Sequence, residues 1–164
     1  MKIKSIAAIC KKNKNIAIFE RYSDDGDILT QYIGDGSAVY PVVGLPQLDK
    51  ESLLTIFDVP EKDRDNYFVK TLGVPVGISF EDTDETERHV EREGISIIYS
   101  GRTLKPIRTT RGLVFIESRY LSPVADVLDV LELYERRTAE GTPYIVAKAG
   151  FLLQAVIMPY DVIN

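Results

Sequence analysis

Apolar residues in the first 43 positions form short runs separated by polar turns, and the runs are rich in isoleucine, valine and aromatic residues. Such side chains favour β-strands. The turn Gly34-Asp35-Gly36 is typical of a hairpin, because glycine tolerates a positive φ between two apolar runs. The turn at residues 11–14 separates the first two runs. We therefore predict a meander of antiparallel strands, at residues 2–10, 15–22, 28–33 and 37–43.

A short amphipathic helix is predicted over residues 49–58. Asp49 is a plausible N-cap, and Pro60 stops the helix. The apolar face consists of Leu53, Leu54 and Phe57. The charged residues 61–65 that follow should form a turn or a single helical turn.

Strand-forming side chains return after this helix. Residues 66–81 have β-branched and aromatic content, interrupted at Gly73 and Pro75. Three more short strands are predicted, at residues 95–100, 103–110 and 113–118, with glycine turns between them. Proline cannot donate to a strand ladder, so Pro106 should lie at a sheet edge or a bulge.

A second amphipathic helix is predicted over residues 122–141. Ser122 suits its N-cap and Pro123 its first position. Apolar residues recur at the spacing of one helical face, at Val124, Val127, Leu128 and Leu131. Arg136 and Arg137 near the end would complement the helix dipole.

Two apolar runs joined at Gly150 end the chain and predict a buried hairpin or a pair of core strands over residues 142–159. The order is strands, helix, strands, helix, strands, without the strict alternation of a βαβ fold. We expect an α+β fold with antiparallel sheets. The 164 residues, 45% of them hydrophobic, suffice for one well-buried core, so a single domain over residues 1–164 is expected. The acidic segment 81–94 is the joint if this domain consists of two similar halves.

Cysteine content and hydropathy indicate the surroundings of the protein. The one cysteine, Cys10, excludes an intramolecular disulfide and lies in an apolar run, so we expect a buried thiol and a reducing, cytoplasmic setting. No stretch approaches the roughly 18 apolar residues of a membrane span. No contact with a membrane is expected.

Charge is distributed unevenly around a formal net value of −5. Residues 1–22 carry six bases and one acid, residues 23–93 carry six bases and seventeen acids, and residues 94–122 carry five bases and one acid. The basic segments could make local phosphate contacts, but the field of the whole molecule repels a polyanion at low salt. Avid non-specific binding of nucleic acid is therefore not expected.

Several short stretches resemble one domain of the bacterial DNA sliding clamp, the processivity ring of DNA polymerase III. "IGDGSAVYPV" at 33–42 is similar to the clamp's Asp-Gly turn before an apolar strand, and a helix at 49–58 follows it as in a clamp. "RGLVFIESRYLSP" at 111–123, "VLDVLELY" at 127–134 and "AVIMP" at 155–159 resemble the later strand, helix and last strand. The resemblance implies a clamp-like fold of two helices against two antiparallel sheets.

This chain departs from the clamp pattern in ways that concern function. A clamp is a ring of several such domains lined by basic helices, whereas this chain is long enough for one domain. The predicted helices present mainly acidic residues on their polar faces, among them Asp126, Asp129 and Glu132. Neither helix would line a DNA channel well.

The segment "EDTDETERHVEREG" at 81–94 contains seven acids and the chain's only histidine. In a helix, Glu85, His89 and Glu93 would share one face, where two carboxylates and an imidazole could hold a divalent cation. The alternative is a solvated helix or mobile loop, because the segment has no apolar face to dock it. We favour the solvated connection and assign no metal site.

The basic segment "SGRTLKPIRTTRG" at 100–112 offers a possible phosphate or acid contact through Arg102, Lys105, Arg108 and Arg111. Nearby tyrosines could stack on bases. On a strand, however, Lys105 and Arg108 point to opposite sides. Charged residues at strand edges also protect a sheet against aggregation.

No catalytic constellation is present in the sequence: there is no Gly-x-Ser-x-Gly elbow and no glycine-rich phosphate loop. We therefore expect an interaction domain without turnover chemistry or cofactor, acting through a protein partner or self-association. A clamp-like accessory of DNA metabolism or of a mobile element is one form of this hypothesis. The alternative is a metal-dependent hydrolase or nuclease with acids clustered around His89. Weak nucleic-acid binding through the basic segment is the third possibility.

Overall fold

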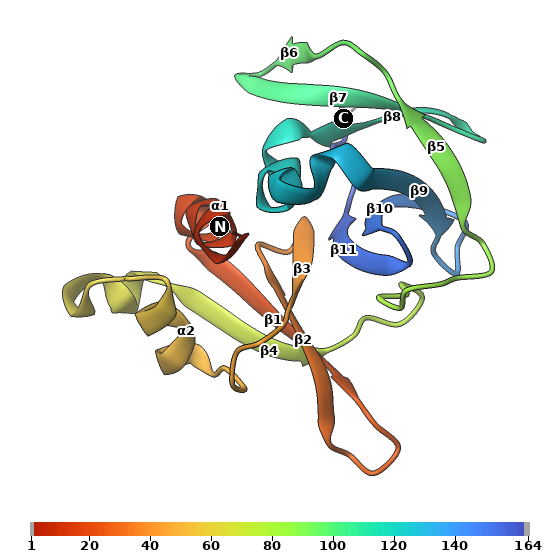
Figure 1. The fold of residues 1–164 in the computed structure, drawn as a ribbon. Helices are drawn as coiled ribbons and strands as arrows, with labels where there is room; N and C mark the ends of the chain where they lie inside the picture. The colour runs from red at the N-terminus through yellow and green to blue at the C-terminus, as the bar shows by residue number, and fades with distance from the viewer. Residues whose placement is uncertain (1, 163–164) are drawn as a thin grey trace.

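The computed structural model describes residues 2–162, within which eleven strands form one sheet, accompanied by two α-helices and two 3₁₀ helices (Figure 1). The first part of the chain contains α1 (Lys2–Asn13), β1 (Asn15–Tyr22), β2 (Ile28–Gly34), β3 (Ala38–Val42), α2 (Lys50–Ile56), η1 (Glu61–Asn66) and β4 (Phe68–Gly73). The second part contains β5 (Arg88–Arg92), β6 (Ile97–Tyr99), β7 (Arg102–Thr109), β8 (Gly112–Glu117), η2 (Ser118–Val130), β9 (Leu131–Arg137), β10 (Pro143–Ala149) and β11 (Leu152–Ile157). The predicted α+β class with a mainly antiparallel sheet is confirmed.

Hydrogen-bonded neighbours in the sheet follow the order β4-β1-β2-β3-β11-β10-β9-β5-β7-β6, and β8 pairs with β7. Within the described residues the pairing of β1 with β4 is parallel and the other pairings are antiparallel. Parallel strands need a crossover connection, and here the chain between them passes through α2 and η1. The pairing of β3 with β11 joins the strands of the first part of the chain to those of the second part in one sheet.

The predicted first strand, residues 2–10, is wrong, because this segment forms the helix α1. Ile6, Ala7 and Cys10 are buried on one side of it, at helical spacing. The helix ends where Lys14 adopts a positive φ of 57° and donates its backbone N–H to the Cys10 carbonyl at 2.9 Å. Such a left-handed residue is a common helix C-cap.

The predicted helix after the first strands is confirmed as α2. Asp49 accepts the backbone N–H of Ser52 at 2.9 Å, and the Ser52 hydroxyl accepts the backbone N–H of Asp49 at 2.8 Å, which completes a capping box. At the other end, Asp58 has a φ of 57° and Val59 donates back to the Leu54 carbonyl at 3.0 Å. The helical turn predicted next is η1.

The second predicted helix, residues 122–141, is wrong over much of its length. It comprises part of the 3₁₀ helix η2, the strand β9 and the start of the following turn. Leu131, Leu133 and Glu135 are buried at alternate positions of β9, which pairs with β10 on one side and β5 on the other. Arg136 therefore lies within a sheet and complements no helix dipole. Residues 127–134, which resemble a helix of the sliding clamp, are therefore the end of η2 and the start of β9.

The predicted hairpins are observed. The turn at Gly34-Asp35-Gly36 joins β2 to β3, and β10 pairs with β11 across Gly150. Strands β6, β7 and β8 follow each other as expected. The expected sheet edge or bulge at Pro106 is wrong, because β7 pairs with β8 on one side and with β6 and then β5 on the other, and Pro106 is in register with Phe115 of β8. Its backbone faces the point where the partner changes from β6 to β5, and its carbonyl there accepts the Glu93 N–H at 3.4 Å, so the missing N–H is tolerated.

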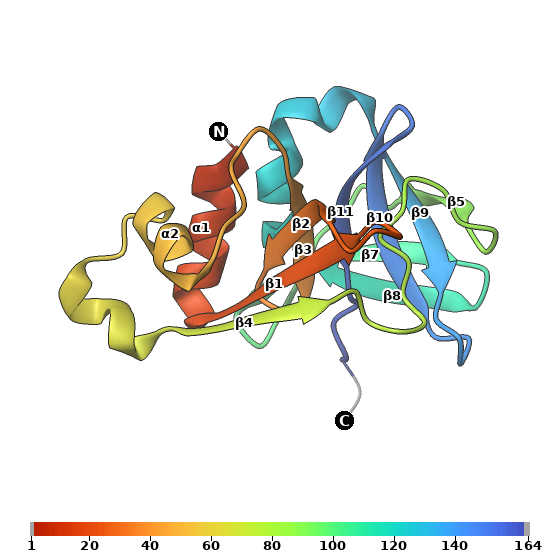
Figure 2. The same ribbon diagram turned by 90° about the horizontal axis from the view of Figure 1, so that it is seen from below.

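The two faces of the sheet are covered differently (Figure 2). Helices α1, α2 and η2 pack on the face that carries the larger core, which includes Ile18, Ile33, Leu54 and Val124. The smaller core, around Tyr144, lies on the opposite face and is closed by the segment between β4 and β5. That segment contains most of the acidic residues of the stretch 81–94, which was predicted to be a solvated connection.

Candidate functional site

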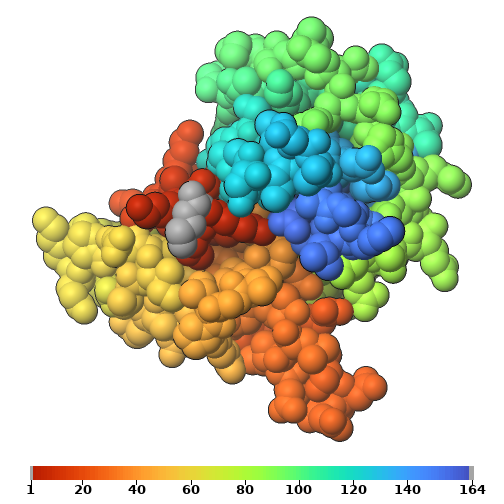
Figure 3. All heavy atoms as spheres, in the orientation of Figure 1, coloured from red at the N-terminus to blue at the C-terminus, as the bar shows by residue number. Residues whose placement is uncertain are grey.

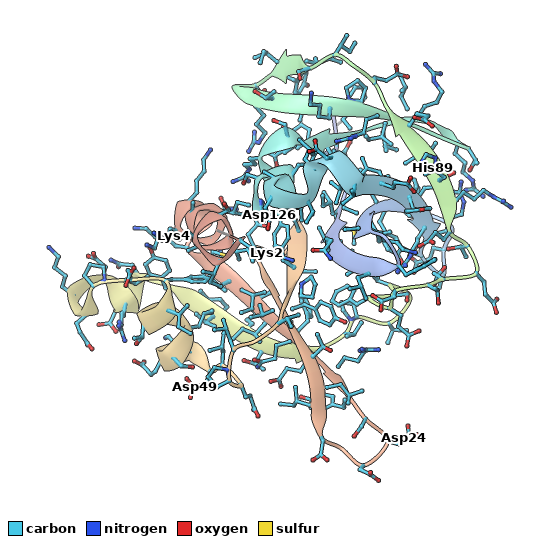
Figure 4. The ribbon with its side chains drawn as sticks, in the orientation of Figure 1. Lys2, Lys4, Asp24, Asp49, His89 and Asp126 are labelled. Carbon is cyan, nitrogen blue, oxygen red and sulfur yellow. The ribbon has the colours of Figure 1, made fainter. Side chains whose placement is uncertain are left out.

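His89 lies on β5, so the alternative in which Glu85, His89 and Glu93 share a helical face is wrong, because residues 88–92 pair as a strand. Figure 4 labels His89 beside β5. Its imidazole is 46% exposed, stands edge-on to the Tyr134 ring at 5.4 Å, and places Nε2 3.9 Å from a Glu132 carboxylate oxygen. Among residues 2–162, no three His, Cys, Asp or Glu side chains are placed to hold a metal ion.

Glu87, in the same acidic segment, is the shared counter-ion of two buried cations. Its Oε1 accepts hydrogen bonds from Arg136 Nε at 3.0 Å and Nη2 at 2.8 Å, while Oε2 accepts one from Lys148 Nζ at 2.9 Å. The Arg136 side chain is completely buried and also donates to the Ser79 carbonyl at 3.1 Å. A buried cation without a partner is strongly unfavourable. The prediction of a solvated connection is therefore wrong at Glu87, which holds the segment against β9 and β10.

Two arginines of the basic segment are paired with carboxylates on the protein itself. Arg102 Nε lies 3.2 Å from Glu117 Oε1, and its guanidinium stacks over the Tyr160 ring at 5.1 Å. Arg108 Nη2 lies 3.2 Å from Glu93 Oε1. These contacts neutralise part of the positive charge that the sequence offers to a phosphate.

The other two basic residues lie apart from these pairs. Lys105 and Arg108 have opposite parity on β7, as expected for a strand. Arg111 lies in the turn before β8 and donates to the Gly141 carbonyl at 3.4 Å. The four side chains therefore do not form one cluster: Arg102 and Arg108 are in ion pairs, Lys105 lies in the middle of β7, and Arg111 lies in a turn. A phosphate or acid contact through Arg102, Lys105, Arg108 and Arg111 stays a prediction.

A largely buried polar network connects the β2–β3 hairpin to α1 and η2. The fully buried Asp35 carboxylate accepts the Tyr120 hydroxyl at 2.7 Å and the Asn13 amide at 3.0 Å, and the Tyr40 hydroxyl donates to the Tyr120 carbonyl at 2.6 Å. Burial, followed by the Asp35 carboxylate, raises the pKa of Tyr120. The same two causes raise the pKa of the Cys10 thiol to about 12. Cys10 is buried as predicted, and the network joins α1, the β2–β3 hairpin and η2, with an exposed end at Asn13.

An apolar groove follows the seam between α1 and α2. It consists of two adjoining hollows of about 380 and 290 Å³, which share Ile3 and Ile56 in their walls. The larger hollow continues along the β3–α2 connection, where Val43 is 86% exposed. The smaller one continues along the α1 side chains Ala7 and Ala8. Both views of the ribbon place α1 beside α2, and Figure 3 shows α1 (red) at the surface beside that connection (orange).

The rim of this groove is basic on the α1 side. Lys2, Lys4 and Lys11 line the two hollows, and α1 contains no acidic residue. Figure 4 shows Lys2 and Lys4 projecting from the first turns of α1. Asp58, at the end of α2, contributes one negative charge to the smaller hollow. The groove therefore combines an apolar floor with a mainly positive edge in a protein whose formal net charge is −5.

Comparisons with protein-family models, with curated proteins and with solved structures each found no match to this chain. In the part of the chain from residue 2 to residue 162, no helix has the length and apolar character needed to cross a bilayer. The geometry of the groove is therefore the basis for a functional proposal.

The sequence-based candidates did not include the groove residues. The signal that identifies them is the helical spacing of Ile3, Ala7 and Lys11, which puts them on one side of α1. The strand prediction for residues 2–10 separated Ile3 from Lys4 and hid this face. Ile56 could not be assigned to the same groove, because its position beside α1 depends on the tertiary fold.

Proposed function

We propose that the protein is a non-enzymatic interaction domain, which binds an acidic amphipathic segment of a partner protein in the groove between α1 and α2. The observation that carries this proposal is the continuity of the two apolar hollows through Ile3 and Ile56, with Lys4 and Lys11 beside the smaller hollow and Lys2 beside the larger one. Grooves of this kind bind the apolar face of a helix or extended segment through a few anchoring side chains.

The chemistry of the groove defines the partner. Each leucine-sized side chain that becomes buried contributes about 1.5–3 kcal/mol, so two or three anchors suffice for a measurable affinity. Carboxylates beside these anchors would meet Lys4 and Lys11, while basic side chains would be repelled. The 12 residues of α1 span about 18 Å at 1.5 Å per residue, which matches three turns of a bound helix.

Two designed peptides test the proposal. Both have leucines at the spacing of one helical face, and their other positions carry glutamate in one peptide and lysine in the other. Titration calorimetry should show binding of the acidic peptide and none of the basic one. Lys4→Glu and Ala8→Glu should each weaken the acidic peptide about tenfold or more. Lys50→Glu makes the same charge change on α2 outside the groove and should leave the affinity within about twofold.

Equal binding of the two peptides would refute the charge complementarity. Retained affinity in Ala8→Glu, with an unchanged circular dichroism spectrum, would place the binding elsewhere on the molecule. The clamp resemblance adds no observation at the groove, and a role in DNA metabolism or in a mobile element stays a prediction.

A further inference from the structure

A third hollow, of about 220 Å³, lies beyond the groove and adjoins it through Lys2 and Val43. Its walls come from distant parts of the chain: the start of α1, the strands β1 to β3, the segment around Phe80, and β11. Unlike the groove, it combines cationic side chains with an aromatic wall. Lys2 also lines the groove, whereas Arg21, Asp82 and Gln154 belong to this hollow and not to the groove.

Lys2 brings a half-buried ammonium group to this hollow. Its Nζ donates to the Gln154 side chain at 3.4 Å, and within residues 2–162 it forms no salt bridge. Burial lowers the pKa of Lys2, and the more distant Asp126 opposes this effect only in part. An ammonium group that is partly removed from water without a close counter-ion is a favourable position for an anion.

Arg21 is the second cation of the hollow, and its hydrogen-bonding capacity is also incompletely used. The guanidinium makes one contact of 3.6 Å, to Glu81, whose side chain is 65% exposed. Its Nε is buried and, among the described residues, has no hydrogen-bond partner. The charge of Arg21 acts at the Tyr32 hydroxyl, where it lowers the pKa of that group against the larger effect of burial. Arg21 therefore directs positive potential into the hollow.

An apolar wall stands beside these cations. The rings of Tyr32 and Phe80 meet edge to face with centroids 4.9 Å apart, and the Tyr32 hydroxyl donates to the Phe80 carbonyl at 3.2 Å. Asp82 also lines the hollow and accepts the backbone N–H of Leu153 at 2.9 Å. Two cations and one carboxylate line the hollow, so its lining carries one excess positive charge. Glu81 approaches Arg21 from outside the lining and offsets part of this charge, so the hollow disfavours a dianion.

We propose that this hollow binds a monoanionic carboxylate attached to an aromatic or aliphatic group, with the carboxylate near Lys2 and Arg21 and the apolar group against Tyr32 and Phe80. A free C-terminal residue of a peptide and a small carboxylic acid share this chemistry. The site adjoins the peptide groove and shares Lys2 with it, but Arg21, Tyr32 and Phe80 lie outside the groove, so the proposal does not require that the groove binds a partner.

N-acetylphenylalanine and its uncharged amide are matched probes for this site. In an NMR titration, the acid should shift the Tyr32 and Phe80 ring signals, and the amide should bind at least about tenfold more weakly because it lacks the charged hydrogen-bond acceptor. Arg21→Gln should weaken the acid by about tenfold. Glu81→Gln should bind it as tightly as the wild type or more tightly, since a competing carboxylate is removed. Phenylacetate and a dipeptide with a free C-terminal phenylalanine distinguish a small acid from a peptide end.

Equal affinities for acid and amide, or unchanged affinity in Arg21→Gln with an intact fold, would overturn the proposal. Tighter binding of inorganic phosphate than of N-acetylphenylalanine would overturn the preference for a monoanion. Ala8→Glu, which blocks the groove, should leave N-acetylphenylalanine binding unchanged. The peptide-binding proposal for the groove and the carboxylate-binding proposal for the hollow can thus be refuted independently of each other.

Discussion

Replacing Glu87 with alanine removes the shared counter-ion of Arg136 and Lys148. Arg136 is fully buried and Lys148 is 6% exposed, so neither cation reaches enough water to replace the lost carboxylate. The change also leaves three charge-assisted hydrogen bonds of 2.8–3.0 Å without an acceptor. Two cations would then lie close together, and their remaining contacts would include the Ser79 carbonyl at Arg136 and the Tyr134 ring at Lys148.

The magnitude follows from the burial of these groups. Breaking a buried ion pair by removal of one partner costs about 3–5 kcal/mol, and at this chain length each kcal/mol lowers Tm by about 2–4 °C. We expect the free energy of unfolding of Glu87→Ala to fall by about 3–5 kcal/mol and Tm by about 6–20 °C. By contrast, replacing all three charged residues with apolar ones of similar volume should be close to neutral, because the desolvation cost disappears together with the attraction.

Urea unfolding followed by circular dichroism measures these differences, with the slope of the transition checked for constancy. Glu85→Ala is the matched control: it removes an exposed glutamate from the same segment and should change stability by less than about 0.5 kcal/mol. A loss of under 1 kcal/mol in Glu87→Ala would refute the counter-ion role. A triple apolar variant as unstable as Glu87→Ala would show that the charges themselves stabilise the fold.

Two further predictions concern titration. The hydrogen bonds from the Ser52 backbone and side chain lower the pKa of Asp49. The stability that this cap supplies is therefore present above about pH 5 and is lost as the pH falls through the folded-state pKa. The urea midpoints of wild type and Asp49→Ala should differ at pH 7 and converge in acid. The pKa of the Cys10 thiol is raised to about 12, so iodoacetamide at pH 8 should modify Cys10 only after the protein is unfolded in urea. Mass spectrometry measures the modification. Rapid modification of the native protein would contradict the burial of Cys10 in α1.

The sequence was sufficient for elements whose signals are local. The helix cap at Asp49, the hairpin at Asp35 and the strands around Gly101 and Gly112 depend on turn and capping chemistry that residues four or fewer apart determine. The first segment was misassigned because isoleucines favour strands, although Ile3, Ile6 and Cys10 also fit a helical period. Composition and period disagreed there, and packing against η2 stabilises the helix.

The second misassignment has a different cause. Val124, Val127, Leu128 and Leu131 follow a helical period, but the chain changes from η2 to β9 within that pattern, and Leu128 is 42% exposed. The burial of Arg136 cannot be predicted locally, because its partner Glu87 lies 49 residues earlier. The groove and the third hollow likewise require residues that only the tertiary fold brings together.

The hydrogen bond between Asp35 and Tyr120 joins residues 85 positions apart, and the Tyr40–Tyr120 bond spans 80. Closing loops of this length costs conformational entropy before any contact compensates for it, so contacts of high sequence separation slow folding. The β1–β2 hairpin and the β9–β10–β11 meander can form from local contacts. The pairing of β3 with β11, by contrast, joins strands that are more than 100 residues apart in the sequence. During synthesis, β3 can therefore pair with β11 only after residues 152–157 have left the ribosome, more than 100 residues after β3 itself.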